Sequence, residues 1–344
     1  MKTVRPFLLA LVFGAGTLSM AQAQTPPKPD PQMQAVLDQL GALGGKPIEK
    51  LTPAQARLQP TPADAVKALL KKEGKSTDPE AVGSVQNTTV PGPAGPIPIR
   101  VYTPSGDGPF PVIFYIHGGG WVIATMDTYD ASPRAMVNLT NAMVVSVEYR
   151  KAPEHKFPAA HEDCYAALQY VMKNAATMKG DPKRVAVMGE SAGGNMASAI
   201  CMMARDRKGM MPLYEALVYP VANTNFNTPS YIVNAKAKPL NKAMMQWFAR
   251  HTVKNAFDAK DPYLAILKGN VKGLPPATVI TDEIDPLMSE GQAYAAKLKK
   301  AGIVVRYRNY MGVTHEFFGM GAVVDKAKDA EQFAADGLKS AFGK

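Results

Sequence analysis

Apolar runs alternate with helical patterns along most of the chain, from about residue 84 to its end. The later runs are almost continuously apolar, which is typical of strands buried on both faces. Because helical patterns separate them, they predict a parallel sheet covered by helices on both sides. The expected strands are 85–90, 97–102, 112–116, 143–147, 184–188, 213–219, 277–281 and 304–310. The first two are joined by a Pro/Gly-rich stretch and predict a hairpin at the sheet edge, so the expected fold class is α/β with a mostly parallel sheet.

A serine lies at one junction between an expected strand and a helix. It is Ser191, in the run Gly-Glu-Ser-Ala-Gly at 189–193, after strand 184–188 and before a helical pattern at 195–200. A sharp strand–turn–helix of this kind, the nucleophile elbow, holds a serine hydroxyl above the sheet. Glycines flank the serine because larger side chains would collide with the strand and the helix. This pattern arises by chance in roughly one chain in ten of this length, so it needs support from a second motif.

The second motif follows the expected strand 112–116 and reads His-Gly-Gly-Gly at 117–120. It arises by chance in roughly a few chains per thousand. Glycines let backbone N–H groups approach a substrate closely, and two such groups can bind the oxyanion of a tetrahedral intermediate. The two motifs together predict acyl transfer by a serine nucleophile.

Five segments of the chain together resemble the hormone-sensitive-lipase group of the α/β-hydrolases, also called bacterial esterase family IV. They are 117–121, 148–160, 189–194, 285–287, and His315 with Phe317. These segments follow the order of the family over most of the expected sheet. The resemblance implies an α/β-hydrolase fold of eight strands with a helical cap, and a serine carboxylesterase that needs no cofactor.

A serine nucleophile needs a base and a carboxylate that orients the base. Of the five histidines, only His315 lies late in the chain, just after the last expected strand. Asp282, Glu283 and Asp285 all follow the seventh expected strand and compete by position. The Asp-Pro-Leu segment of the family falls on Asp285, so the resemblance implies a triad of Ser191, Asp285 and His315. The other histidines are interpreted as loop, helix or cap residues: His117, His155, His161 and His251.

The resemblance also implies which groups bind the substrate. The oxyanion hole would combine the N–H of Ala192 with the glycine loop, at Gly119 and Gly120, with Gly118 in the same patch. Trp121 directly follows these glycines and either lines the acyl pocket or packs within the loop. A pattern rich in Met and aromatics at 241–248 predicts a helix that roofs the site. Its candidate substrate contacts are Met244, Trp247 and Phe248.

Three residues depart from the family pattern. Lys151 stands where Leu is usual, Glu190 where Asp is commonest before the nucleophile, and Glu316 where Gly usually follows the histidine. Glu190 and Glu316 flank two members of the expected triad. Either they tune its protonation, or they form local hydrogen bonds only.

The first 23 residues have the pattern of a secretory signal peptide. Lys2 and Arg5 precede an apolar stretch at 7–18 that is too short for a membrane span, and Ala-Gln-Ala at 21–23 resembles a cleavage site. We therefore expect an exported, periplasmic or secreted protein. Residues 24–83 predict a linker and cap helices at 33–40 and 62–70, and 84–344 the catalytic domain, with a cap insertion at about 221–260.

Composition narrows the possible partners and cofactors. The net charge is +10, but the lysines are scattered rather than interleaved with aromatics, so we expect no nucleic-acid partner. No Cys/His cluster has metal-ligand spacing and no nucleotide-binding fingerprint occurs, so we expect neither a metal nor a cofactor. Cys164 and Cys201 are expected to be free thiols. The quaternary state is expected to be a monomer or a homodimer.

The expected substrate is a small ester with a short or medium acyl chain, because a cap would bound the pocket. An amidase or an acyltransferase on the same fold is the alternative, since the triad serves those acceptors as well. A ligand-binding relative without catalysis is a third interpretation, which the presence of His315 disfavours.

Overall fold

The computed structural model describes Met1 and residues 26–343, so nearly all of the expected signal peptide lies outside the described residues. Its centre is one eight-stranded sheet in the order β1-β2-β4-β3-β5-β6-β7-β8. The β1–β2 and β2–β4 pairs are antiparallel and all other pairs are parallel. The strands are β1 (Ser84–Gly92), β2 (Gly95–Thr103), β3 (Phe110–Ile116), β4 (Met143–Val147), β5 (Gly180–Glu190), β6 (Glu215–Val218), β7 (Ala277–Ile284) and β8 (Val305–Thr314).

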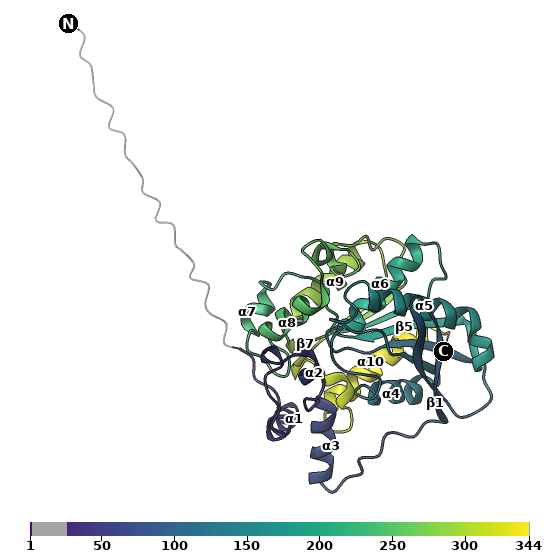
Figure 1. Cartoon of the computed structure of the whole chain (residues 1–344), viewed down its shortest axis with the longest axis horizontal. Helices are drawn as coiled ribbons and strands as arrows, with labels where there is room; N and C mark the ends of the chain where they lie inside the picture. The colour runs from purple at the N-terminus through teal and green to yellow at the C-terminus, as the bar shows by residue number, and fades with distance from the viewer. Residues whose placement is uncertain (2–25, 344) are drawn as a thin grey trace.

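Helices cover both faces of this sheet, as the apolar runs predict (Figure 1). On one face lie α5 (Ala159–Asn174), followed by η2 (Ala175–Met178), α6 (Ala192–Asp206) and α9 (Met288–Lys300); on the other lie α4 (Ala131–Thr140) and α10 (Asp325–Ala341). Alternate residues of β3 separate accordingly: Phe114 belongs to the core on the α5–α6 side and Tyr115 to the core on the α4–α10 side. Both are fully buried, which agrees with a strand that is apolar along its whole length.

The predicted strands are all present, with differences at their ends. The hairpin of β1 and β2 is at the sheet edge, as expected. β7 and β8 continue three and four residues beyond the expected ends at 281 and 310, because β7 pairs with β8 up to Ile284 and Thr314. β6 is shorter than the expected 213–219. Because β7 and β8 continue side by side, Asp285 and His315 follow their C-terminal ends at the same end of the sheet.

The N-terminal segment forms more helices than its sequence pattern predicts. These are α1 (Pro31–Ala42), η1 (Ile48–Lys50), α2 (Pro53–Ala56) and α3 (Pro62–Lys72). The expected start of α3 is confirmed: Thr61 caps the helix, Pro62 is its first residue, and Asp64 completes a capping box with Thr61. The helix α1 packs against α3 and contacts β8. This segment therefore lies beside β8, the outer strand that His315 directly follows.

The chain between β6 and β7 contains α7 (Pro229–Val233), α8 (Lys242–Thr252), η3 (Asp258–Lys260) and η4 (Ile266–Lys268). Figure 1 shows α7 and α8 at the same end of the sheet as the N-terminal helices, and α8 contacts η1 directly. Within the described residues, no helix combines the length and the apolar character needed to cross a membrane.

Candidate active site

Ser191 lies in the sharp turn between β5 and α6. Its backbone φ is +57° with ψ −117°, a conformation that L-residues rarely adopt and that costs of order 1–3 kcal/mol. The flanking glycines are required sterically. A Cβ at Gly189 would lie 2.2 Å from the carbonyl oxygen of Gly193, and a Cβ at Gly193 would lie 2.0 Å from that of Ile116. The turn therefore has the geometry that its sequence predicts for a nucleophile elbow.

The predicted triad residues lie in one hydrogen-bonded series. The Nε2 of His315 is 2.9 Å from the Oγ of Ser191, and its Nδ1 is 2.7 Å from the Oδ2 of Asp285. The Oδ1 of Asp285 accepts from the backbone N–H of Leu287 at 2.8 Å. All three side chains are buried, Ser191 with 5% of its surface exposed. These residues come from the ends of β5, β7 and β8, so the sheet brings together side chains that are 124 positions apart at most.

The surroundings of His315 favour its protonated form. Burial alone lowers the pKa of an imidazole, but the carboxylate of Asp285, followed by those of Glu316 and Glu190, outweighs burial and raises the pKa of His315 above its ordinary value. The ring of Tyr219 packs against the imidazole with 4.5 Å between centroids. This environment stabilises an imidazolium, which is what a base needs after it has taken a proton.

The two acids that compete with Asp285 by position are placed differently. The Oε2 of Glu283 accepts the backbone N–H of Gly312, which joins the ends of β7 and β8. Asp282 is fully buried, and burial together with the negative charge of Asp285 raises the pKa of Asp282 well above its usual range. Of these three acids, Asp285 is the one in hydrogen-bond contact with His315.

One group of three potential metal ligands occurs among the described residues: Asp282, Asp285 and His315, whose ligand atoms lie within 4.8 Å of one another. Both ring nitrogens of His315 are engaged, with Asp285 and with Ser191. A cation at this place would have to displace the hydrogen bond between His315 and Asp285. The arrangement is thus accounted for by the hydrogen-bonded series.

Several backbone N–H groups of the glycine loop and of the first residue of α6 have no acceptor among the described residues. The N–H groups of Gly118, Gly119, Gly120 and Ala192 donate to none of the described residues. Gly119 and Gly120 line the cavity above Ser191, whereas Ala192 starts α6, whose N-terminus carries positive partial charge. Both loop glycines have positive φ, and a Cβ at Gly119 would lie 2.3 Å from the carbonyl oxygen of Ile123. The loop can therefore aim donors at an oxyanion only with glycine at this position.

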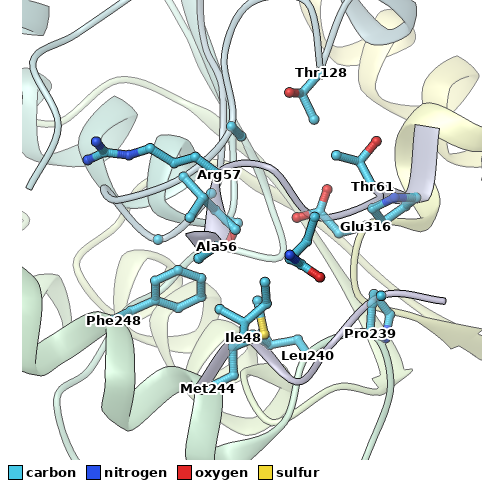
Figure 2. Close-up of a pocket in the computed structure, with 18 of the residues that line it drawn as sticks. Ile48, Ala56, Arg57, Thr61, Thr128, Pro239, Leu240, Met244, Phe248 and Glu316 are labelled. Carbon is cyan, nitrogen blue, oxygen red and sulfur yellow. The ribbon is translucent and has the colours of Figure 1, made fainter. Parts of the chain in front are cut away.

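A cavity of about 1030 Å³ opens above Ser191 and His315. Its walls come from the glycine loop, from the N-terminal segment and from the insertion before β7. Figure 2 shows Ile48, Leu240, Met244 and Phe248 gathered on one side of it. Met244 and Phe248 lie on α8 and line the cavity, as the sequence predicts.

Neither tryptophan lines the cavity, so the expected substrate contact of Trp247 is wrong and, of the two alternatives for Trp121, packing within the protein holds. Trp121 is 5% exposed and stacks near His161, because the turn after the glycines directs its ring into the core. Trp247 is 3% exposed, and its indole N–H donates to the carbonyl of Leu51. Its ring packs against Phe248 and His251, and its hydrogen bond fastens the N-terminal segment to α8.

Several residues at the site carry no motif that would reveal them in the sequence. Arg57, on the N-terminal segment, donates to the carbonyls of Val122 and Ala152 and forms an ion pair with Glu154. It thereby ties the roof of the cavity to the loop that follows the glycines. Tyr219 stacks on His315 and donates to the carboxyl of Glu190. An arginine or a tyrosine in an irregular segment gives no local signal of such contacts.

Glu190 and Glu316, the two departures beside the triad, both form hydrogen bonds with tyrosines. Glu190 is buried and accepts from the hydroxyls of Tyr115 and Tyr219. Burial raises the pKa of Glu190 to about 7, although these hydrogen bonds oppose the rise. Glu316 accepts from the hydroxyl of Tyr129 at 2.6 Å. Both carboxylates raise the pKa of His315, so they affect the triad and also form local hydrogen bonds.

The predicted thiol state agrees with the structure: Cys164 and Cys201 are both buried and free. Burial raises the pKa of each thiol well above its usual value, so neither is a candidate nucleophile. Of the other histidines, His161 is held by Asn195, and burial lowers its pKa to about 4. His117 stacks on Tyr149 beneath the glycine loop, which agrees with a role in shaping that loop.

The sheet order, the turn at Ser191 and the position of His315 after the last strand define the class of α/β hydrolases. The family described as alpha/beta hydrolase fold matches residues 113–319. Among its relatives, the carboxylic ester hydrolase LipN of Mycobacterium tuberculosis is 38% identical over 249 residues, and the alignment covers 70% of this chain and 66% of LipN. The ethyl acetate hydrolase of Pseudomonas putida is 30% identical over 318 residues, which cover 90% of this chain and 98% of that enzyme.

Solved structures give the same assignment. The esterase of Pyrobaculum calidifontis superposes with a TM-score of 0.81 at 36% identity, covering 90% of this chain and 98% of that one. The chain therefore belongs to the α/β-hydrolase family, in the hormone-sensitive-lipase-like group of carboxylic ester hydrolases.

Proposed function

We propose that the protein is a serine carboxylesterase that hydrolyses short- to medium-chain acyl esters through Ser191, His315 and Asp285. The observation that carries the proposal is the unbroken hydrogen-bonded series from the hydroxyl of Ser191 to the carboxylate of Asp285, next to unused N–H donors. Membership of a family of carboxylic ester hydrolases supports the same chemistry.

In the first step, Ser191 attacks the ester carbonyl while the Nε2 of His315 takes the hydroxyl proton. The carbonyl oxygen becomes an oxyanion, which the N–H of Ala192 and the N–H groups of Gly119 and Gly120 stabilise. Each such donor contributes about 2.7–4 kcal/mol to transition-state stabilisation. Asp285 holds the Nδ1–H of the imidazole and stabilises the imidazolium.

The imidazolium then returns its proton to the leaving alcohol, and the acyl group stays on Ser191. A water molecule then attacks the acyl-enzyme while the Nε2 of His315 takes its proton, and the acid leaves as Ser191 regains a hydrogen. The same imidazole thus serves as base and acid twice. Catalysis needs no group beyond these side chains and the backbone donors.

The preference for short and medium acyl chains rests on the roof over the site. Segments of the N-terminal helices and of α8 wall the cavity above Ser191, and apolar side chains from both, such as Ile48 and Phe248, line it. A relative of 30% identity is an ethyl acetate hydrolase, which acts on a short ester. A bounded cavity admits an acyl chain only up to the length that its walls allow.

A panel of p-nitrophenyl esters with two to sixteen acyl carbons tests this preference. We expect kcat/KM to be highest at about four to eight carbons and to fall at least about tenfold for the longest chains, because a long chain cannot stay inside the roofed cavity. Anilides of the same acids and added alcohol acceptors would reveal an amidase or an acyltransferase. A maximum at sixteen carbons would contradict the proposed substrate range.

The raised pKa of His315 predicts where activity is lost in acid. The base must be neutral to accept the proton of Ser191, so kcat/KM should fall as the pH falls through the pKa of His315. Since that pKa lies above its ordinary value of 6.5, the midpoint of the acid limb should lie above pH 6.5. Initial rates between pH 5 and 9 measure it. Glu190→Gln, which removes one of the carboxylates that raise this pKa, should move the midpoint downward, and a wild-type midpoint below 6.5 would contradict the expected electrostatics.

A further inference from the structure

Glu316 has a backbone conformation that favours glycine. Its φ is +73°, in the left-handed region, which a residue with a Cβ adopts only at a cost in free energy. The family that this chain resembles usually has glycine here, immediately after the histidine. A glutamate at this position therefore carries a backbone cost in free energy that a glycine would not.

The carboxylate of Glu316 lies beside the atom that handles the proton of the leaving alcohol. Its Oε1 is 3.8 Å from the Nε2 of His315 and accepts the hydroxyl of Tyr129 at 2.6 Å. The side chain is 21% exposed and lines the cavity. None of the described residues donates a hydrogen bond to its Oε2. The carboxylate of Glu316 therefore keeps one oxygen free to accept a hydrogen bond, while its other oxygen lies near the Nε2 of His315.

Two long basic side chains that line the same cavity do not pair with Glu316, because each has an acidic partner of its own. Lys151 forms an ion pair with Glu148, and Arg57 forms one with Glu154. Glu316 is left as a carboxylate on the cavity wall whose hydrogen bond comes from one tyrosine. An additional donor from a substrate would complete its hydrogen bonding.

The cavity has two unlike sides. Figure 2 shows Glu316 across from Phe248 and Met244, with Thr61 and Thr128 nearer to Glu316. The ring of Phe248 lies against the glycine loop, so closely that a Cβ at Gly120 would be 2.4 Å from it. Because that loop binds the carbonyl oxygen, the apolar side adjoins the acyl group. Because the leaving oxygen must reach the Nε2 of His315, the polar side adjoins the alcohol.

Resting on the proposed function, we propose that Glu316 determines specificity for esters whose alcohol carries a free hydroxyl on the carbon next to the ester-bearing carbon. Monoesters of glycols, glycerol and sugars have this arrangement. Their hydroxyl can donate to the carboxylate of Glu316 while the leaving oxygen lies at the Nε2 of His315. The protein is basic, with a net charge of +10, which favours a neutral hydroxyl over a cationic alcohol as the donor.

The expected discrimination follows from the strength of a hydrogen bond to a charged acceptor. Such bonds change an equilibrium or a rate by about tenfold to a hundredfold. Because Glu316 is partly exposed and water can replace the hydroxyl, the effect should be near the lower value, about tenfold. The preference belongs to the alcohol part and is independent of the acyl chain.

A matched pair of esters, 2-hydroxyethyl butyrate and propyl butyrate, tests the proposal. They differ by a hydroxyl in place of a methyl group, so shape is preserved. Wild-type kcat/KM should be about tenfold higher for the hydroxyethyl ester. In Glu316→Gly, whose glycine suits the positive φ, the ratio of the two kcat/KM values should fall to about one; losing a carboxylate beside His315 changes the rates on both esters alike, so the ratio is the readout. Glu316→Gln should be intermediate, because an amide oxygen still accepts a hydrogen bond without the charge.

Two results would overturn the proposal and leave the esterase assignment intact. One is equal wild-type hydrolysis of both esters, and the other is an equal loss on both esters in Glu316→Gly, which would make Glu316 a positioning residue for His315. A wild-type protein that cleaves neither ester, and whose Ser191 does not react with a fluorophosphonate, would overturn the proposed function and this inference together. Labelling at Ser191 thus distinguishes the two failures.

Discussion

Ser191→Ala is expected to lower kcat for a short-chain ester by about 10⁴- to 10⁶-fold. The substitution removes the oxygen that attacks the carbonyl and leaves His315 and the N–H donors in place. Some acceleration over the uncatalysed reaction remains, because binding and the oxyanion hole still act on a water molecule. Steady-state rates with p-nitrophenyl butyrate, corrected for spontaneous hydrolysis, measure the loss.

Two controls separate loss of the nucleophile from loss of the fold. Alanine can occupy the backbone conformation of Ser191 as well as serine does, so the far-UV circular dichroism and melting temperature should stay close to wild type. Ser340→Ala changes an exposed serine on α10 and should retain full activity. A fluorophosphonate should label wild type and Ser340→Ala but not Ser191→Ala. Wild-type turnover by Ser191→Ala would show that another residue is the nucleophile.

The sheet could be predicted from the sequence because its strands are buried on both faces. A strand such as β3 must be apolar along its whole length, and that run is visible without any knowledge of its neighbours. The elbow at Ser191 and the glycine loop could be found for a similar reason. Their geometry needs glycine at fixed positions within a few residues, as the close approach of Gly193 to Ile116 illustrates. Constraints that act locally leave local patterns.

The roof and the outer contacts of the site could not be predicted in this way, because they join segments far apart in the chain. Trp247 was a plausible substrate contact on an apolar helix, but the carbonyl of Leu51 determines which way its indole points. Arg57 forms its hydrogen bonds with Val122 and Ala152, in two separate loops that it meets only after folding. The choice of acid likewise required the family resemblance, because Asp282 and Asp285 both follow the strand expected at 277–281.

The pair Asp285→Asn and Asp282→Asn should behave very differently although the two residues are three positions apart. An amide at position 285 can turn its NH₂ group toward the Nδ1 of His315 and hold the imidazole in the tautomer that carries its proton on Nε2. That nitrogen then cannot accept the proton of Ser191, and we expect kcat to fall by about 10⁴-fold. Asp282→Asn puts an amide of similar shape in place of a buried carboxyl that makes no hydrogen bond to His315, so kcat should change by less than about tenfold.

The double variant tests whether the buried Asp282 substitutes for Asp285. Its carboxyl lies within 4.8 Å of the ligand atoms of His315 and Asp285, close enough to move into the vacated role. If it does so, Asp285→Asn alone would lose much less than 10⁴-fold, and adding Asp282→Asn would remove the remaining activity. If it does not, the double variant should match Asp285→Asn within about threefold, since the second change acts on a side chain outside the hydrogen-bonded series. We expect the second result, because Asp285 alone combines contact with the Nδ1 of His315 and a backbone donor, the N–H of Leu287, that fixes its other oxygen.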